Sequence, residues 1–339
     1  MKRNGIFLRS AALLLSLLSL LSLFGCNRKN ETKNRIFYEY FDTVSTVYDY
    51  SGGSVSAFEK NATFVKERLE YYHRLFDIYN EYDGINNIAT VNRLAGQGEV
   101  EVDEELIEFL EYAVKIHGLT DGHTNIAMGS VLSIWHKYRT IGRDVPTESE
   151  LLAAAEHTNI ENLVLNKEKR SVRFLDPEMS LDVGAIAKGY AVERVAEELI
   201  AKGVSSYVLD VGGNLRIIGT KPDGTTWRTG VQNPNPYAEE RYVYYLDVAD
   251  TSVVTSGDYQ RYYIVDGVKY HHIINKDTLM PATYFSSVTI VTKDSGLADA
   301  LSTALFNMDY ESGVKLVSKL DGVSVIWVDK DGEVKKYGI

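Results

Sequence analysis

The fold of this chain is most constrained by residues 181–192, Leu-Asp-Val-Gly-Ala-Ile-Ala-Lys-Gly-Tyr-Ala-Val, which place two glycines, an acid and a lysine in one short run. β-type sequence precedes them at 172–174 and 179–183, and apolar residues recur at helical spacing from Ala187 to Ile200. The run therefore predicts a loop that opens at a helix N-terminus, where free N–H groups and the helix dipole favour phosphate or carboxylate. A glycine-rich turn with a packing role explains the same residues at least as well.

The N-terminus indicates an export signal. Basic Lys2, Arg3 and Arg9 precede a Leu-, Ala- and Ser-rich stretch at 11–24, and Gly25-Cys26 follows. This arrangement resembles a bacterial lipobox, in which Cys26 is lipidated and becomes the first mature residue. An uncleaved anchor is the alternative, although an apolar core of about 14 residues is short for a span of about 20. Either outcome tethers the protein to the extracytoplasmic face of a cell membrane.

The mature protein is expected to be acidic and free of disulfides. Cys26 is the only cysteine, so the exported domain must rely on its core. Removal of residues 1–25 leaves a formal charge of −14, which disfavours nucleic acid and anionic lipid as partners. Binding of a phosphorylated ligand would therefore need a metal cation or local backbone donors.

Periodicity predicts an α+β fold with a mixed or antiparallel sheet and flanking helices, because helical and β-rich blocks segregate along the chain. We expect a signal peptide at 1–25, a flexible lipidated tether at 26–35 and one folded domain at 36–339. Asp103 stands at an N-cap position before one of the helices. The other predicted helices are 57–76, 104–119, 147–157, 297–306 and 311–320, and the other predicted strands are 36–50, 207–211, 215–219, 227–231, 242–248, 253–256 and 260–265, with hairpins at 266–267 and 331–332.

Asp299 and Thr303 lie four residues apart on the predicted helix 297–306, which places both oxygens on one face. Mg²⁺ prefers hard oxygen ligands and keeps several waters or phosphate oxygens, so one carboxylate and one hydroxyl form a reasonable protein contribution. The alternative is that Asp299 is a first-turn acid favoured by the helix dipole.

His271 and His272 end a predicted hairpin arm. On a strand the two rings point to opposite faces, so at most one faces a given cleft. The residues themselves favour a half-buried structural pair, with a general base, a phosphate partner or a metal ligand as alternatives.

Three further segments have a structural and a ligand-binding interpretation. Residues 209–214 form either an anion-binding turn or a tight hairpin, and the hairpin is the safer prediction. Residues 120–125 predict a turn after a helix, with a ligand-binding loop as the alternative. Phe41 and Tyr79 suit stacking on a planar ligand but suit packing as well.

These motifs, and the order in which they follow one another along the chain, resemble those of the ApbE family of FAD:protein FMN transferases. The resemblance runs from about residue 41 to residue 306, and it rests on the segments 182–191, 210–214, 272–275 with Pro281-Ala282, and 298–303. It implies a T-fold-like catalytic domain. Family members commonly have Met-Gly-Thr where this chain has Phe41-Asp42-Thr43.

The resemblance implies a set of site residues. The backbone carbonyl of Ala185 and the side chains of Asp299 and Thr303 would hold Mg²⁺, and Asp182 and Lys188 would contact FAD. The flavin site would be lined by Phe41, Tyr79, His123, Thr124, Asn125 and Ile273. We hypothesise that His272 contacts the substrate and accepts the proton of the acceptor threonine.

The implied reaction moves FMN from FAD to a threonine hydroxyl of an exported or membrane acceptor protein and releases AMP. A Mg²⁺-dependent FAD pyrophosphatase, with water in place of threonine, is one alternative. An extracytoplasmic flavin-binding lipoprotein without catalytic activity is the other.

Overall fold

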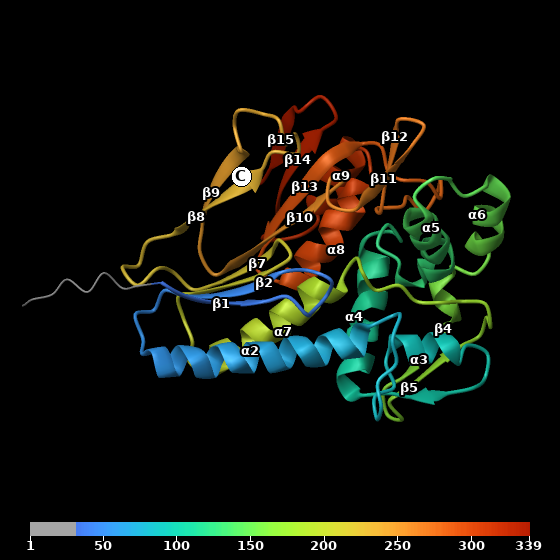
Figure 1. Ribbon diagram of the computed structural model, residues 1–339, viewed down its shortest axis with the longest axis horizontal. Coiled ribbons are helices and arrows are strands. Elements are labelled where there is room, and N and C mark those ends of the chain that lie inside the picture. The colour runs from blue at the N-terminus through green and yellow to red at the C-terminus, as the bar shows by residue number, and fades with distance from the viewer. Residues whose placement is uncertain (1–31) are drawn as a thin grey trace, which may run out of the picture. The chain divides into compact units, whose positions relative to one another are not determined.

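The structure is a computed structural model that describes residues 32–339 (Figure 1). The predicted signal peptide, the lipidation residue Cys26 and most of the predicted tether lie outside the described residues. Strand β1 begins at Lys33, so the last three residues of the expected tether already pair in the sheet. Within residues 32–339, every helix is too short or too polar to cross a membrane.

An eight-stranded, wholly antiparallel sheet forms the centre of the domain. Its strand order is β1-β2-β6-β7-β10-β13-β14-β15. Each strand pairs antiparallel with its neighbours, as expected of an α+β domain. The strands are β1 (Lys33–Phe37), β2 (Ser45–Asp49), β6 (Tyr207–Val211), β7 (Asn214–Ile218), β10 (Thr251–Gly257), β13 (Phe285–Thr292), β14 (Ser324–Asp329) and β15 (Val334–Tyr337).

Three smaller sheets surround the large one. They are the three-stranded sheet β3-β5-β4 and the hairpins β8-β9 and β11-β12. The β8-β9 hairpin buries Val231 and Leu246 with Val253 and Ile326 of the large sheet. The bounds are β3 (Val100–Glu101), β4 (Leu163–Asn166), β5 (Ser171–Phe174), β8 (Trp227–Gln232), β9 (Tyr242–Val248), β11 (Tyr262–Val265) and β12 (Val268–His271).

Helices α7 and α8 pack on one face of the large sheet, and α2 packs against α7 and against strands β1 and β2 (Figure 1). This face buries the two largest apolar clusters, one shared by α2, α4 and α7 and the other by α8, β13 and β14. The helices are α2 (Val55–Phe76), α3 (Ile88–Arg93), α4 (Glu104–Leu119), α5 (Gly129–Ile141), α6 (Glu148–Ala155), α7 (Ala187–Ala201), α8 (Ser295–Phe306) and α9 (Tyr310–Val317).

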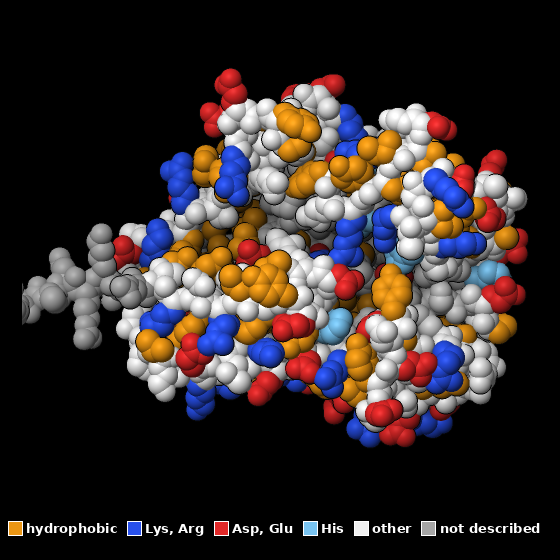
Figure 2. Space-filling view, in the orientation of Figure 1, with side chains coloured by type: hydrophobic (Ala, Val, Ile, Leu, Met, Phe, Trp, Pro, Cys, Tyr) orange, Lys and Arg blue, Asp and Glu red, His pale blue; other side chains and the backbone are white. Residues whose placement is uncertain are grey.

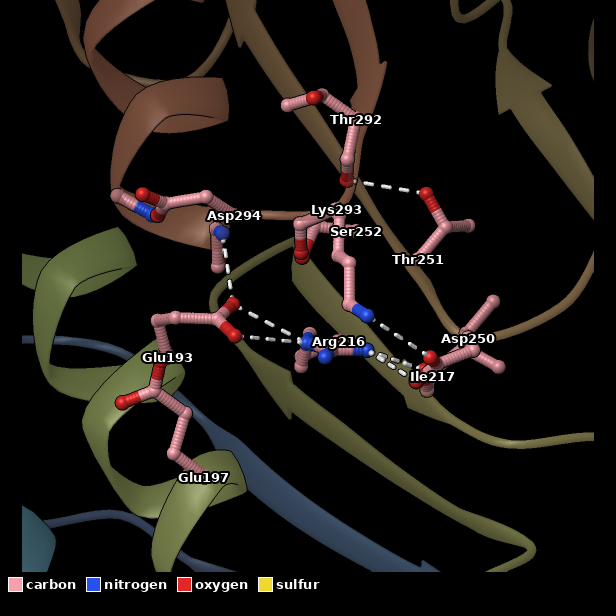
Figure 3. A network of polar contacts seen from close by, with 12 residues as sticks. Glu193, Glu197, Arg216, Ile217, Asp250, Thr251, Ser252, Thr292, Lys293 and Asp294 are labelled. Carbon is pink, nitrogen blue, oxygen red and sulfur yellow. Dashed lines mark hydrogen bonds and ion pairs between the residues drawn. The ribbon is translucent and has the colours of Figure 1, made fainter. Parts of the chain in front are cut away.

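A buried ion pair fixes α7 against the sheet and against the start of α8 (Figure 3). Arg216 on β7 is 1 % exposed, and its Nε donates to Oε2 of Glu193 on α7 at 3.1 Å. The same Oε2 accepts the backbone N–H of Ser295 at 2.8 Å. Because an isolated buried charge is unfavourable, this network holds the two helices in one relative position.

The α+β prediction is confirmed, and most of the predicted elements are present with shifts of a few residues. The predicted strand at 36–50 is wrong as one element, because β1 and β2 form a hairpin there. The predicted strand at 179–183 is also wrong, since that segment is an irregular stretch before α7. Helix α4 matches its prediction, with the Asp103 side chain accepting the N–H of Glu105.

Candidate active site

A cavity of about 680 Å³ opens where the start of α7, the face of α8, helix α5 and the β11-β12 hairpin converge. Its volume lies within the range typical of small-molecule and cofactor sites. Basic side chains and histidines lie together on this side of the molecule, between α8 and α5 (Figure 2). All the predicted site residues within the described range line the cavity: Phe41, Tyr79, His123, Thr124, Asn125, Asp182, Ala185, Lys188, His272, Ile273, Asp299 and Thr303.

Asp299 connects α8 to the first turn of α7. Its Oδ2 accepts the backbone N–H of Gly189 at 2.9 Å, and Lys188 Nζ lies 3.4 Å from both carboxylate oxygens. Ile186, the N-cap of α7, provides no side-chain cap, so Asp299 acts as the capping acid from another helix. The expectation of a free helix N-terminus is therefore only partly met, because one of its amides is already bonded.

The loop before α7 brings a second part of the cavity wall beside Asp299. Asp182 is 8 % exposed, and its Oδ1 accepts the N–H of Gly184 at 2.9 Å. Ala185 follows directly and also lines the cavity. Segments more than a hundred residues apart in sequence thus meet at one wall.

The donors at this wall suit a hard cation. Asp299 and Thr303 stand one turn apart on α8 and line the cavity together with Ala185. Within residues 32–339, no group of three or more His, Cys, Asp or Glu side chains is arranged to hold a metal. A cation here would therefore be bound by one carboxylate, one hydroxyl and one carbonyl, with ligand oxygens and water completing its shell, which is the behaviour of Mg²⁺.

The two adjacent histidines have opposite environments, as strand geometry predicts. His271 is buried, with Nε2 2.8 Å from the carbonyl oxygen of Ala282 and Nδ1 accepting the N–H of Ile273 at 3.2 Å. His272 lines the cavity, with Nδ1 3.2 Å from the Arg261 carbonyl oxygen. That contact assigns the proton to Nδ1 and leaves Nε2 as the acceptor. Burial, followed by the positive charge of Arg261, lowers the pKa of His272 to about 3, so the ring is neutral at physiological pH.

Tyr79 is held at the cavity by a histidine that the sequence patterns did not identify. The Tyr79 hydroxyl lies 2.9 Å from Nδ1 of His136 on α5, and Nε2 of the same ring lies 3.6 Å from Oδ2 of Asp182. Burial lowers the pKa of His136, so it is neutral and has one N–H. The neighbouring carboxylate favours that N–H on Nε2, so the Tyr79 hydroxyl donates to Nδ1.

The other predicted flavin-site residues contribute mainly apolar surface and backbone to the cavity wall. Phe41 has φ 55° and packs edge-on against His73, with ring centroids 5.7 Å apart. The Thr124 hydroxyl donates to the carbonyl oxygen of Ala300, and the Asn125 side chain caps the short helix at 126–128. Both polar groups are therefore bonded within the protein. Ile273 is 5 % exposed and belongs to the α8 core.

Residues 210–214 form a tight hairpin, as the structural interpretation predicts. Gly212 and Gly213 connect β6 to β7 with φ of 59° and 88°, values that favour glycine. A Cβ at Gly212 would overlap the side chain of Thr43. The hairpin nevertheless borders the cavity, through Gly212 and Asn214.

Two arginines at the cavity were also missed from the sequence. Arg139 lies on α5, which was not predicted, and Arg261 lies in the turn between β10 and β11. Neither belongs to a recognisable motif, so only the tertiary structure brings them to His272.

Fold and cavity together define an α+β protein built around a site of cofactor size in which a carboxylate, a hydroxyl and several cationic groups converge. The chain belongs to the ApbE family, whose model matches residues 42–327.

Similar proteins span most of the chain. It is 29 % identical over 328 residues to the FAD:protein FMN transferase of Vibrio cholerae, covering 96 % of each chain. It is 32 % identical over 265 residues to the protein of that name from Treponema pallidum, covering 73 % of this chain and 72 % of that one. Among solved structures, the ApbE protein of Thermotoga maritima superposes with a TM-score of 0.80 at 28 % identity, covering 91 % of this chain and 97 % of that chain. Flavin transferase ApbE of Vibrio cholerae superposes with a TM-score of 0.75 at 26 % identity and the same coverage.

Proposed function

We propose that this chain transfers the FMN part of FAD to a threonine hydroxyl of a partner protein, with Mg²⁺ as the required cation, and releases AMP. The main support is the convergence on one cavity of an oxygen-donor wall at Asp299 and Thr303 and a neutral histidine with a free Nε2. Family membership and the names of the similar proteins support a flavin transfer.

The proposed reaction is a single displacement at phosphorus. The threonine oxygen forms a bond to the FMN phosphorus while the bond from that phosphorus to the bridging pyrophosphate oxygen breaks, and AMP leaves with the electron pair. His272 accepts the threonine proton at Nε2, and its Nδ1 contact with the Arg261 carbonyl oxygen keeps the ring oriented. Lys188 contributes a positive charge beside the oxygen-donor wall.

Ala185, Asp299 and Thr303 would hold Mg²⁺, which when bound would neutralise phosphate charge and stabilise the leaving oxygen. The remaining wall residues orient FAD. The exposed Tyr79 ring, fixed through His136, provides a platform for the flavin ring.

The assignment of His272 is tested by His272→Ala. Loss of the proton acceptor should lower the transfer rate by about 10²- to 10⁴-fold and leave the FAD dissociation constant within a factor of about two. Mass spectrometry of the acceptor measures transfer, and quenching of flavin fluorescence measures binding. Unaltered transfer would contradict the role of His272.

Product analysis separates the proposed transferase from the two alternatives. The purified protein is incubated with FAD, Mg²⁺ and an acceptor bearing an Asp-x-x-Ser/Thr-Gly/Ala-Thr segment. An increase in acceptor mass together with AMP supports the transferase. Free FMN with AMP identifies a pyrophosphatase, and unchanged FAD identifies a carrier.

The proposed location is the extracytoplasmic face of a bacterial cell membrane, with a lipid on Cys26. The support is the basic, apolar and Gly25-Cys26 sequence at the N-terminus. Replacement of Cys26 by Ala should release the protein from the membrane fraction. Retention of that variant in the membrane would favour an uncleaved anchor.

A further inference from the structure

Arg139 and Arg261 line the cavity from two different segments, and neither makes an ion pair with a carboxylate. Arg139 on α5 is half-buried, and the exposed Arg261 donates from Nη2 to the Asp42 carbonyl oxygen at 3.4 Å. Among residues 32–339, no Asp or Glu oxygen lies within 4 Å of either guanidinium. By contrast, the cavity cation Lys188 is paired with Asp299.

A half-buried guanidinium that makes no direct ion pair is energetically unfavourable. Burial lowers the pKa of Arg139 and so does the like charge of Arg261, while Tyr79 and the Asp182 carboxylate act in the opposite direction. Acidic residues also line the cavity, but none of them makes an ion pair with either guanidinium: Glu39, Asp42, Asp77, Asp182 and Asp299. A bound anion would supply the direct ion-pair partner that neither arginine has within the protein, and planar guanidinium groups match the geometry of carboxylate and phosphate.

The two arginines lie at the His272 part of the cavity. The charges of Arg261 and Arg139 both lower the pKa of His272, and both act on His136 as well. The oxygen-donor wall at Asp299 has its own cation, Lys188. The arginine pair is therefore a second positive centre, beside the group proposed to accept the threonine proton.

We propose that Arg139 and Arg261 form an oxyanion subsite that binds a carboxylate or phosphate group carried by one of the two substrates. This inference rests on the proposed transferase function. The oxyanion comes either from a phosphate of FAD or from an acidic side chain close to the acceptor threonine, because both substrates must meet at His272.

Two binding assays distinguish the sources without requiring turnover. FAD binding is measured by flavin fluorescence with Mg²⁺ present, and acceptor binding by anisotropy of a fluorescein-labelled peptide bearing the Asp-x-x-Ser/Thr-Gly/Ala-Thr segment, with its Asp→Asn form for comparison. Arg139→Gln and Arg261→Gln are compared with Arg143→Gln. Arg143 is an exposed arginine near the end of α5 and outside the cavity, so the control removes the same charge.

Each subsite variant should weaken one of the two complexes by about 10-fold or more, since a charge-assisted hydrogen bond is lost. Weaker FAD binding assigns the subsite to phosphate. Weaker peptide binding, with no further loss for the Asp→Asn peptide, assigns it to the acceptor carboxylate. Arg139→Lys should retain part of the affinity.

Unchanged affinity for both ligands, or an equal loss in Arg143→Gln, would overturn the proposal. Because both readouts are equilibrium binding, a protein that binds FAD but transfers nothing would contradict the proposed function and still test the subsite. Urea denaturation of each variant confirms that a loss of binding does not reflect unfolding.

Discussion

The backbone N–H of Gly189 donates to Oδ2 of Asp299 at 2.9 Å, so the first turn of α7 is capped by a side chain of α8. A Cβ at Gly189 would overlap the Ser295 carbonyl oxygen and lie 2.5 Å from Cβ of Asp299. Glycine is therefore required for the two helices to approach closely enough for this bond. The same bond orients the carboxylate proposed to bind Mg²⁺.

Replacement of Gly189 by alanine should force α7 and α8 apart. We expect the free energy of unfolding to fall by about 1–3 kcal/mol, the usual cost of overpacking. The Mg²⁺ concentration for half-maximal transfer should rise, because Asp299 loses its orienting bond. Urea denaturation and a Mg²⁺ titration measure the two effects.

Gly118→Ala is the matched control for that substitution. Gly118 also lies in a helix, α4, and a Cβ there meets nothing within 4 Å. This variant should be as stable as the parent or slightly more so, because alanine favours helix more than glycine does. Equal destabilisation by both substitutions would contradict the role assigned to Gly189.

The Glu193–Arg216 pair should be a strong determinant of stability. The Glu193→Ala variant leaves Arg216 buried without this partner, and we expect a loss of about 3–5 kcal/mol in the free energy of unfolding. A second substitution, Arg216→Met, should restore part of that loss, since it removes a buried charge that keeps only the half-exposed Asp250 as a partner. A double variant less stable than Glu193→Ala would show that the charge itself is not the cause.

Tyr79 and His136 should act as a unit in flavin binding. The Tyr79→Phe variant keeps the ring but removes the hydroxyl that lies 2.9 Å from His136, and His136→Ala removes the partner. Each should weaken FAD binding by about 3- to 10-fold, the loss expected for one hydrogen bond. The double variant should be no weaker than the more affected single variant, and fully additive losses would argue against the pair.

Acid should destabilise the domain, in part through His272. Its folded-state pKa of about 3 lies below the value of about 6.5 for an unfolded histidine, so protons bind preferentially to the unfolded chain. The resulting stability is fully present above about pH 6.5 and is lost as pH falls toward 3. Burial also lowers the pKa of four other histidines in the same direction: His117, His123, His136 and His271.

Urea midpoints of the parent and His272→Asn between pH 7.5 and 4.5 measure this contribution. The parent should lose stability more steeply than the variant as the pH falls. Parallel pH profiles would show that His272 does not titrate as its environment predicts. The effect concerns stability, so it is measured without substrate.

Local sequence was sufficient for most of the helices and strands. Amphipathic spacing and the Asp103 cap specify α4, and Asp266-Gly267 specifies the β11-β12 turn, because these signals act within a few residues. Strand β13 was missed because most of its residues are buried in the middle of the sheet and apolar–polar alternation covers only Val288 to Ile290. Helix α5 was missed although it contributes His136 and Arg139.

The sequence by itself determined the α+β class, the motif residues of the cavity wall and the absence of any disulfide in the domain. Tertiary structure alone decided how these residues act together. Asp299 caps a helix that begins more than a hundred residues earlier, His136 holds Tyr79, and two arginines line one cavity without an ion-pair partner. Such relationships depend on the packing of α7, α8 and α5, which arises from contacts between distant segments and leaves no periodic signal in the local sequence.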